Sequence, residues 1–225
     1  MFCAHSTEIN LGIQKFTSYV EIMKIVCIGR NYADHAKELG NDLPKEPLFF
    51  NKPDSAILAK GNPFFIPEWT SDVHYEIELV FKVNRLGKYI QKEHAWKYIS
   101  EFTVGIDFTA RDVQEQLKTK GQPWEKAKSF DGSAFIADQW LTAEGVDWDA
   151  LTFGLQKNGE WVQRGKAKDM IFKLDTIIEH VSQYMTLKIG DLIFTGTPEG
   201  VGPVSPNDVL TGYINDQKIF DLKVK

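Results

Sequence analysis

Apolar and polar residues alternate along residues 73–81, VHYEIELVF, with the two-residue period of a β-strand. One face carries five apolar side chains, and the opposite face carries His74, Glu76, Glu78 and Val80. Side chains two positions apart on a strand lie roughly 6.5 Å apart and point the same way. Two such carboxylates repel each other unless water or a cation separates them. An antiparallel strand with one solvent-facing side is therefore the simplest interpretation of the two glutamates.

The same kind of pattern predicts the remaining elements. Three helices are predicted. The first spans residues 32–39, begun by Asn31 and ended by Gly40, and the second spans 109–120, where Thr109 and Asp112 are typical of a capping box. The third follows Asp175, where apolar residues recur at helical spacing. Further strands are predicted at 24–28, 48–51, 73–84 and 102–109, in a hairpin over 153–163 that turns at Asn158-Gly159, and in the C-terminal segments LKIGDLIFTG, VSPNDVLTGYI and KIFDLKV.

Short strands joined by tight turns outnumber helices, and no βαβ alternation is apparent. We therefore expect an α+β fold with a large mixed or rolled sheet. No segment has the composition of a linker, which predicts one domain over residues 23–225. The strand-like run MKIVCIG begins at Met23, so residues 1–22 are expected to be an N-terminal extension that the domain does not need.

Composition narrows the classes of function. The chain has 225 residues, 43% hydrophobic and 25% charged, with a net charge of -5. This acidic balance argues against nucleic acid or an anionic membrane as a partner. The two cysteines, Cys3 and Cys27, predict a reduced compartment and no thiolate metal site. No apolar run reaches the ~20 residues that cross a bilayer, and residues 1–22 do not resemble a secretory signal, so a cytoplasmic location is expected.

A third carboxylate follows on the next predicted strand. In FTVGIDFT, residues 102–109, Asp107 lies opposite the apolar face, although aspartate is unfavourable inside a strand. If this strand is close to residues 73–81, Glu76, Glu78 and Asp107 converge on one pocket. Three oxygen donors without thiolates suit Mg²⁺ or Mn²⁺, and Ca²⁺ is also compatible. His74 fits a supporting role better than a ligand.

Five motifs occur in order along the chain: IVCIGRNYADHAKELG, VHYEIELVF, GIDFTARDVQ, PWEKAKSFDG and GDLIFTGTPEGVGP. Over about residues 24–223 they resemble the fumarylacetoacetate hydrolase family, in particular its small single-domain acylpyruvases and oxaloacetate decarboxylases. The resemblance implies a distorted mixed β-roll or barrel with few peripheral helices, a homodimer, and a Mg²⁺ or Mn²⁺ site held by Glu76, Glu78 and Asp107. A bound cation would then explain how the two glutamates tolerate each other.

The predicted helix 32–39 carries His35 and Glu38 on one face. By themselves they fit a solvated surface helix, whereas the resemblance implies a catalytic dyad in which histidine takes a proton from water and glutamate orients the histidine. Histidine suits this role because its ordinary pKa lies near neutral pH. A helix this short is not stable alone. We therefore predict that it is a lid, mobile when empty and ordered over bound substrate.

The remaining candidates are substrate-binding residues. Arg111 and Gln114 share one helix face; Gln114 can donate to a developing oxyanion, while Arg111 either binds a carboxylate or braces acidic neighbours. Lys128 reads as a surface lysine, but the resemblance implies that it faces the metal and stabilises an enolate. Gly196 and Thr197 belong to a glycine-rich loop whose N–H groups could hold a substrate carboxylate, although such a loop is weak support for a site.

The resemblance implies a metal-dependent enzyme that cleaves the C–C bond of acylpyruvates, such as fumarylpyruvate or acetylpyruvate, into pyruvate and a carboxylic acid, with oxaloacetate decarboxylase activity as a related reaction. Two alternatives stay open. One is an isomerase or decarboxylase of the 2-hydroxyhepta-2,4-diene-1,7-dioate type, and the other is a non-catalytic protein whose cation braces the fold. The set of His35, Glu38, Gln114 and Lys128 favours an enzyme that acts on a 2-oxo acid, because a structural metal needs none of them.

Overall fold

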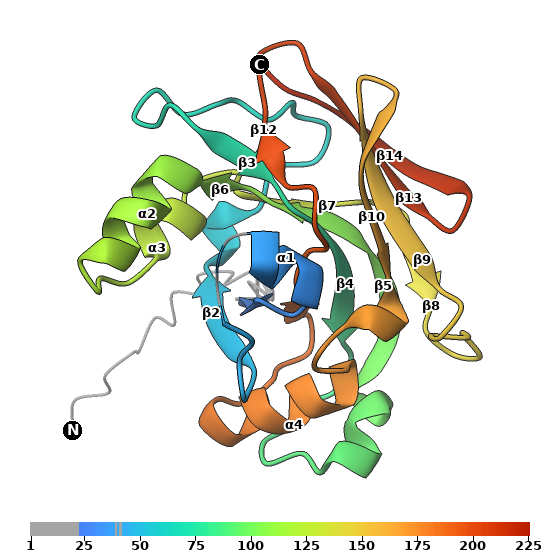
Figure 1. Ribbon diagram of the computed structural model, residues 1–225. Helices are drawn as coiled ribbons and strands as arrows, with labels where there is room; N and C mark the ends of the chain where they lie inside the picture. The colour runs from blue at the N-terminus through green and yellow to red at the C-terminus, as the bar shows by residue number, and fades with distance from the viewer. Residues whose placement is uncertain (1–22, 39, 41) are drawn as a thin grey trace, which may run out of the picture.

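The computed structural model describes residues 23–38, 40 and 42–225, and its strands form three sheets that curl around a shared core (Figure 1). The largest sheet has the order β2-β1-β11-β4-β5-β7, with β8 beside β5. It is mixed, because β1 pairs with β11 in parallel and its other pairs are antiparallel. Its strands are β1 (Ile25–Gly29), β2 (Leu48–Lys52), β4 (Ile77–Val83), β5 (Ile99–Asp107), β7 (Ala134–Ile136), β8 (Leu141–Thr142) and β11 (Leu192–Phe194).

The other two sheets are smaller and antiparallel. One has the order β10-β9-β13-β14 and the other the order β12-β3-β6. Their strands are β3 (Val73–Tyr75), β6 (Thr109–Ala110), β9 (Thr152–Lys157), β10 (Glu160–Lys166), β12 (Gly202–Pro203), β13 (Val209–Ile214) and β14 (Gln217–Lys223). Together the sheets confirm the expected α+β fold with a large mixed, rolled sheet. The predicted extension, residues 1–22, lies outside the described residues.

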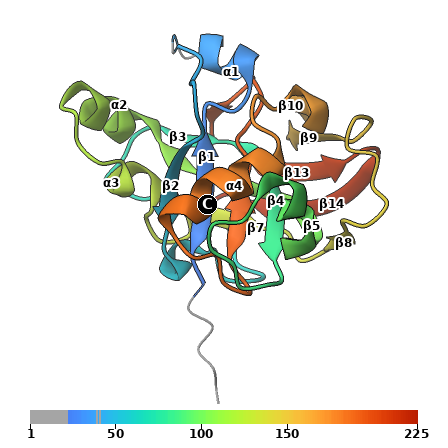
Figure 2. The same cartoon turned by 90° about the horizontal axis from the view of Figure 1, so that it is seen from below.

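Helices are short and peripheral, as predicted. Figure 1 places α2 and α3 together at one side of the sheets, and Figure 2 shows α1 at the edge of the molecule. The α-helices are α1 (Ala33–Glu38), α2 (Arg111–Thr119), α3 (Glu125–Lys128) and α4 (Leu174–Tyr184), and the 3-10 helices are η1 (Asp54–Ala56), η2 (Lys92–Tyr98) and η3 (Ala167–Asp169). Within the described part of the chain, no helix has the length and apolar content needed to cross a bilayer.

Strand β4 is covered on both faces. Leu79 and Phe81 point into the main core, while Val80 belongs to a second apolar cluster with Cys27 and Phe194. The interpretation of residues 73–81 as a strand with one solvent-facing side is therefore wrong. Burial on both faces means that the polar residues of this strand must find partners inside the protein.

Two aligned bends carry the chain from one sheet into another. The predicted strand 73–84 breaks at Glu76, between β3 and β4, and the predicted strand 102–109 breaks at Phe108, between β5 and β6. The breaks are adjacent, because the Asp107 N–H donates to the Glu76 carbonyl at 2.9 Å. Each carboxylate at a bend is thus placed by two sheets at once.

The hairpin prediction is confirmed in its turn chemistry. Strands β9 and β10 pair directly across Asn158 and Gly159, whose φ angles are 55° and 86°. Two consecutive positive φ values define the type I′ turn that matches strand twist, and this is why the Asn-Gly pair predicts such hairpins.

Asn31 does not cap α1. Its side chain donates to the carbonyls of Phe172 at 3.0 Å and Thr195 at 2.8 Å, and it accepts from the Phe172 N–H at 2.7 Å. It therefore ties the turn after β1 to two distant segments of the chain. The sequence indicates only a local capping interaction for Asn31, because the distant carbonyls are brought near this residue by the tertiary fold.

The predicted capping box of α2 is also wrong. The residue before the helix is Ala110, which makes no side-chain cap. Asp112 instead accepts hydrogen bonds from the Thr70 hydroxyl at 2.6 Å and from the Ser71 N–H at 3.1 Å. Burial opposes its ionisation, but these hydrogen bonds outweigh that effect and lower the pKa of Asp112. Asp112 thus anchors the start of α2 to the preceding loop.

Candidate active site

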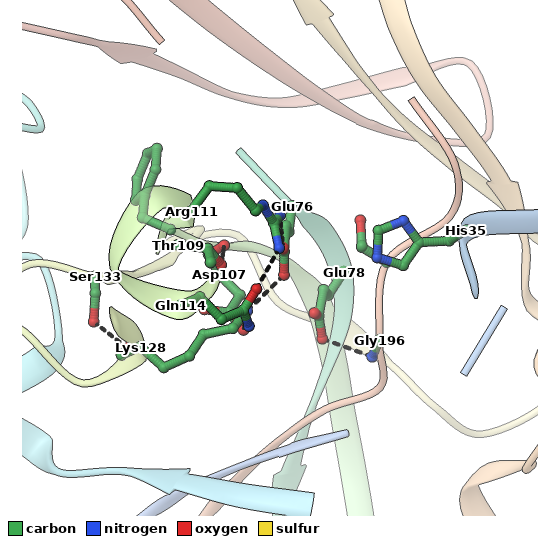
Figure 3. A network of polar contacts seen from close by, with 12 residues as sticks. His35, Glu76, Glu78, Asp107, Thr109, Arg111, Gln114, Lys128, Ser133 and Gly196 are labelled. Atoms are coloured by element: carbon green, nitrogen blue, oxygen red, sulfur yellow. Dashed lines mark hydrogen bonds and ion pairs between the residues drawn. The ribbon is translucent and has the colours of Figure 1, made fainter. Parts of the chain in front are cut away.

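A cavity lies where the two bends meet the end of β1 and the start of α2. Eight of the predicted site residues line it, and Figure 3 shows most of them facing one another. The lining consists of Ile28, Gly29, Arg30, His35, Phe50, Glu76, Glu78, Asp107, Arg111, Gln114, Lys118, Trp124, Lys128 and Thr197.

Glu76, Glu78 and Asp107 converge as predicted. Each offers an oxygen within 4.8 Å of the other two, and the three residues are only 5%, 2% and 1% exposed. All three are carboxylates, and neither a thiolate nor an imidazole belongs to this group of potential ligands. A buried, oxygen-only donor set is the type that a hard divalent cation prefers. The donor set therefore fits Mg²⁺ or Mn²⁺.

The Lys128 ammonium bridges two of these carboxylates. Its Nζ donates to Glu76 Oε2 at 2.7 Å and to Asp107 Oδ2 at 2.8 Å, and the residue is buried. Burial alone would lower the pKa of Lys128, but the charges of Asp107 and Glu76 raise it well above its ordinary value. The lysine is therefore part of the site rather than a surface residue, and it stays protonated at neutral pH.

The two glutamates differ in their electrostatics. Burial opposes ionisation of Glu76, yet Lys128 and then Arg111 hold its pKa well below the ordinary value. For Glu78, burial and then the charges of Asp107 and Glu76 raise the pKa, and only Lys128 and the Gly196 N–H act against them. Glu78 is thus the carboxylate whose negative charge is least compensated by protein groups, which is the property expected beside a metal.

Lys52 was not predicted, although it is fully buried at the end of β2. Its Nζ lies 2.8 Å from Asp107 Oδ1 as an ion pair and donates to the Ser133 carbonyl at 3.1 Å, to Ser133 Oγ at 2.9 Å and to the Lys128 carbonyl. It therefore holds Asp107 and the backbone of Lys128 in one arrangement. We call Glu76, Glu78, Asp107, Lys52 and Lys128 the carboxylate floor.

Arg111 braces the site. Its guanidinium donates to Glu76 Oε1 through Nη2 and to Gln114 Oε1 through Nη1 at 2.7 Å. Because a guanidinium only donates, the Gln114 amide presents its oxygen to Arg111, and its NH₂ group remains for another acceptor. Of the two interpretations kept open for Arg111, the contact with Glu76 corresponds to bracing, while Gln114 retains a donor for a substrate.

His35 and Glu38 come together on α1. His35 Nδ1 lies 3.0 Å from Glu38 Oε2, and Glu38 Oε1 accepts from the Gly200 N–H at 3.1 Å. A carboxylate only accepts, so the proton of the neutral imidazole resides on Nδ1 and Nε2 keeps its lone pair. His35 is buried and lines the cavity, whereas Glu38 is exposed. We call α1 with this Glu38–Gly200 contact the α1 cover.

The Gly196–Thr197 loop lies against the floor. The Gly196 N–H donates to Glu78 Oε2 at 2.7 Å, so in this structure it serves the carboxylate. At its φ of 92°, an added Cβ would lie 2.8 Å from the Cβ of Asn31, so only glycine fits. Thr197 lines the cavity while its hydroxyl bonds the Ile77 carbonyl. A substrate carboxylate on this loop stays a prediction.

His74 lies outside the cavity lining. Its Nε2 is 3.0 Å from Asp72 Oδ1, and the Asp72 carbonyl accepts the Arg111 N–H at 2.7 Å. Burial, followed by the charge of Arg111, lowers the pKa of His74. This placement behind Arg111 agrees with a supporting role.

Four lining residues carried no sequence signal for a site. Arg30 follows β1 with a φ of 57°, Lys118 is in the last turn of α2, and the aromatic side chains are Phe50 and Trp124. Arg30 stands inside one of the five motifs, yet nothing in its local pattern distinguishes it from a surface arginine. Their common position follows only from how β1, β2 and α2 pack.

Family comparison agrees with this geometry. The family model described as "Fumarylacetoacetate (FAA) hydrolase C-terminal" matches residues 24–223. The chain belongs to the fumarylacetoacetate hydrolase family.

Its relatives carry several names. The mouse protein "Oxaloacetate tautomerase FAHD1, mitochondrial" is 42% identical over 201 residues, 89% of this chain and 91% of that protein. "Oxaloacetate decarboxylase, mitochondrial" of Dictyostelium discoideum is 41% identical and covers 88% of this chain and 93% of its own length. Among solved structures, fumarylpyruvate hydrolase from Pseudomonas aeruginosa in complex with Mn²⁺ and pyruvate is 37% identical, with a TM-score of 0.84 over 90% of this chain and 89% of that one. These relatives are named as enzymes.

Proposed function

We propose that this protein is a divalent-metal-dependent enzyme that interconverts the keto and enol forms of an oxaloacetate-like 2-oxo acid. The observation that carries this proposal is the position of His35. Its side chain lines the same cavity as Glu76, Glu78 and Asp107, with Glu38 on its Nδ1. A proton acceptor opposite a candidate cation site is the arrangement that enolisation next to a 2-oxo group requires.

Glu76, Glu78 and Asp107 would hold the ion. When bound, a divalent cation supplies Lewis-acid stabilisation to the carboxylate and 2-oxo oxygens of such an acid. Mg²⁺ and Mn²⁺ are the proposed ions, and the Mn²⁺ in the structure of the Pseudomonas aeruginosa relative supports the second. The remaining chemistry falls to side chains of this chain.

His35 would act as the acid–base group. Its Nε2 takes the proton from C3 of the substrate while negative charge develops on the 2-oxo oxygen, and it returns a proton to give the enol. Glu38 holds the opposite side of the ring and stabilises the imidazolium that forms. The exchange needs no co-reactant, because a proton moves from C3 to the 2-oxo oxygen while the double bond shifts from C2=O to C2=C3, and no group leaves.

Two donors would offset the developing charge. Lys128 uses two of its three N–H groups on Glu76 and Asp107, which leaves one for a substrate oxygen. Gln114 has its NH₂ group available because Arg111 occupies its oxygen. Both residues are buried, and hydrogen bonds to charge are strongest where water is excluded.

Acylpyruvate hydrolysis is the second candidate. The His35–Glu38 pair favours it, because the same Nε2 lone pair would take a proton from water as that water attacks the distal carbonyl, and the C–C bond then breaks to give pyruvate and a carboxylic acid. Oxaloacetate decarboxylation passes through the same kind of enolate without water attack. The three reactions thus share the floor, and hydrolysis and enolisation depend on His35.

The test compares wild type, His35→Ala and Asp34→Ala, which changes an exposed residue of the same helix. With Mg²⁺, each is assayed for keto–enol interconversion of oxaloacetate, for pyruvate release from oxaloacetate and acetylpyruvate, and for isomerisation of a dienoic diacid. We expect His35→Ala to lower kcat/KM for interconversion about a thousandfold while its affinity for Mn²⁺ stays that of wild type. Asp34→Ala should keep the kcat/KM of wild type.

The outcomes separate the candidates. Near-normal interconversion by His35→Ala would remove the base assignment. Faster pyruvate release from acetylpyruvate than interconversion of oxaloacetate would select hydrolysis, and isomer formation from the diacid would select the isomerase. Turnover that persists after complete chelation of divalent cations would contradict the proposed metal dependence.

Three further proposals concern assembly, location and domain extent. A homodimer rests on the family resemblance, whereas a cytoplasmic location and a domain spanning residues 23–225 rest on the sequence pattern. Sedimentation measures the first. The mouse and Dictyostelium relatives are both named as mitochondrial, so fractionation of the native host decides between the two compartments. A chain that starts at Met23 tests whether the domain is active without the preceding segment.

A further inference from the structure

Four positively charged side chains line the cavity, and they divide into two pairs. Arg111 and Lys128 are committed to the carboxylate floor through Glu76 and Asp107. Arg30 and Lys118 form no such contact: within residues 23–38, 40 and 42–225, neither has a carboxylate oxygen within 4.0 Å or a side-chain hydrogen bond. The cavity therefore holds two cations that the described part of the protein does not neutralise.

These two cations affect each other. Burial, followed by the positive charges of Arg111 and Arg30, lowers the pKa of Lys118. Lys118 Nζ also lies 5.8 Å from the centre of the Trp124 ring, whose face attracts a cation and limits where the ammonium can lie. Like charges are thus kept near one another in a partly buried wall, an arrangement that a bound anion would relieve.

The backbone holds Arg30 in an uncommon conformation. Its φ of 57° is in the left-handed region, which costs free energy for a residue other than glycine. The next residue, Asn31, is fixed by three hydrogen bonds to Phe172 and Thr195, so the turn cannot relax freely. Such outliers persist where the surrounding structure over-determines them, and they cluster at ligand sites.

We propose that Arg30 and Lys118 form a subsite that binds the distal carboxylate of a 2-oxo dicarboxylic acid. The inference rests on the proposed function, in which the floor and its ion take the 2-oxo acid end. Because Arg111 and Lys128 are already paired there, Arg30 and Lys118 are left for the opposite end of the molecule. The aromatic rings of Phe50 and Trp124, 5.9 Å apart, would contact the short carbon chain between the two ends.

A matched pair of ligands tests the subsite by calorimetry. 2-Oxoglutarate and 2-oxopentanoate share a five-carbon chain and differ in whether the distal end is a carboxylate or a methyl group. Both are titrated in Mg²⁺ into wild type, Arg30→Gln, Lys118→Gln and the control Lys120→Gln, an exposed residue next to α2 outside the cavity lining. Binding is measured, so the result does not depend on turnover.

We expect wild type to bind the diacid at least about tenfold more tightly than the monoacid. Arg30→Gln and Lys118→Gln should each weaken diacid binding about tenfold and change monoacid binding less than about twofold, while Lys120→Gln changes neither. Raising the ionic strength should weaken diacid binding more than monoacid binding. Lys118→Gln alters a partly exposed helix position and should fold normally, which keeps the test valid if Arg30→Gln disturbs the strained turn.

Three results would overturn the subsite. Wild type would bind the two acids with equal affinity, or it would bind neither acid, or the variants would lose affinity for both acids equally. The proposed reaction is judged separately from turnover of oxaloacetate. If the protein prefers the diacid but turns over no 2-oxo acid, the subsite is supported and the proposed reaction is contradicted. Turnover without a preference for the diacid supports the proposed reaction and rules out the subsite.

Discussion

The carboxylate floor and the α1 cover face the same cavity but are held in different ways. The floor residues lie in or beside β2, β4, β5 and α3 and are at most 5% exposed. Buried ion pairs join four of them, and the fifth, Glu78, accepts a hydrogen bond from the Gly196 N–H. The cover is a six-residue helix whose side-chain attachment to the facing loop is the Glu38–Gly200 hydrogen bond, formed by an exposed glutamate.

The difference follows from what each region must do. Three carboxylates repel one another, so they converge only where backbone from several strands and fixed cations oppose the repulsion. A proton acceptor above them needs no such framework, and a substrate must be able to enter beneath it. The site thus combines a rigid half that organises charge with a lightly held half that carries the proposed base, His35.

The largest expected effect tests the rigidity of the floor. Lys52→Met removes the ammonium from buried Asp107 and from the Ser133 and Lys128 acceptors, and we expect the free energy of unfolding to fall by about 3–5 kcal/mol, because a buried charge loses its partner. Urea denaturation measures it. The control is Lys60→Met, which breaks an exposed pair with Asp138 and should cost less than about 1 kcal/mol. Equal losses in the two variants would show that the floor is not specially braced.

A second prediction addresses the ion. Glu78→Gln keeps the shape of the floor but removes the least compensated carboxylate, and it should weaken Mn²⁺ binding by more than about 100-fold, beyond the effect typical of residues that only support ligands. Calorimetric titration of Mn²⁺ gives the affinity. Glu125→Gln, at an exposed position on α3, should leave it unchanged. Unchanged affinity in Glu78→Gln would remove this residue from the metal site.

The smallest effect concerns motion of the cover. In the free protein, amides of α1 should exchange with solvent about 100-fold faster than amides of β4, since a single short helical turn opens locally. Mg²⁺ with 2-oxoglutarate should slow exchange in α1 only, and α4, an eleven-residue helix with one face packed against the core, is the internal control. Hydrogen exchange that is equally slow in α1 with and without ligand would contradict the lid.

The pattern of the chain predicted most elements because their causes are local. The Asn158-Gly159 turn and the alternation in β4 and β5 need only nearest neighbours in sequence. The caps failed for the opposite reason: Asn31 bonds to segments more than 140 residues away, and Asp112 bonds to a loop about 40 residues earlier. Polar side chains with several accessible partners choose among them only when the fold is complete.

The candidate site divides in the same way. Residue type and spacing indicated Glu76, Glu78 and Asp107 as a candidate cation site, because carboxylates inside strands are chemically conspicuous. The pairing of His35 with Glu38 as a dyad came from the family resemblance, since by themselves the two residues fit a surface helix. Lys52, Arg30 and Lys118 had no such mark. A lysine beside a strand looks alike whether it is solvated or buried.

The amino-acid sequence by itself therefore determined where the strands and turns begin, and which chemically conspicuous groups are candidates for the site, since local periodicity and residue chemistry are properties of the sequence. Tertiary structure alone decided that Glu76 and Asp107 stand at adjoining bends, that Arg111 braces one of them, and which cations remain unpaired. The physical reason is that charge compensation depends on distances between segments far apart in sequence, and only packing of the sheets sets those distances.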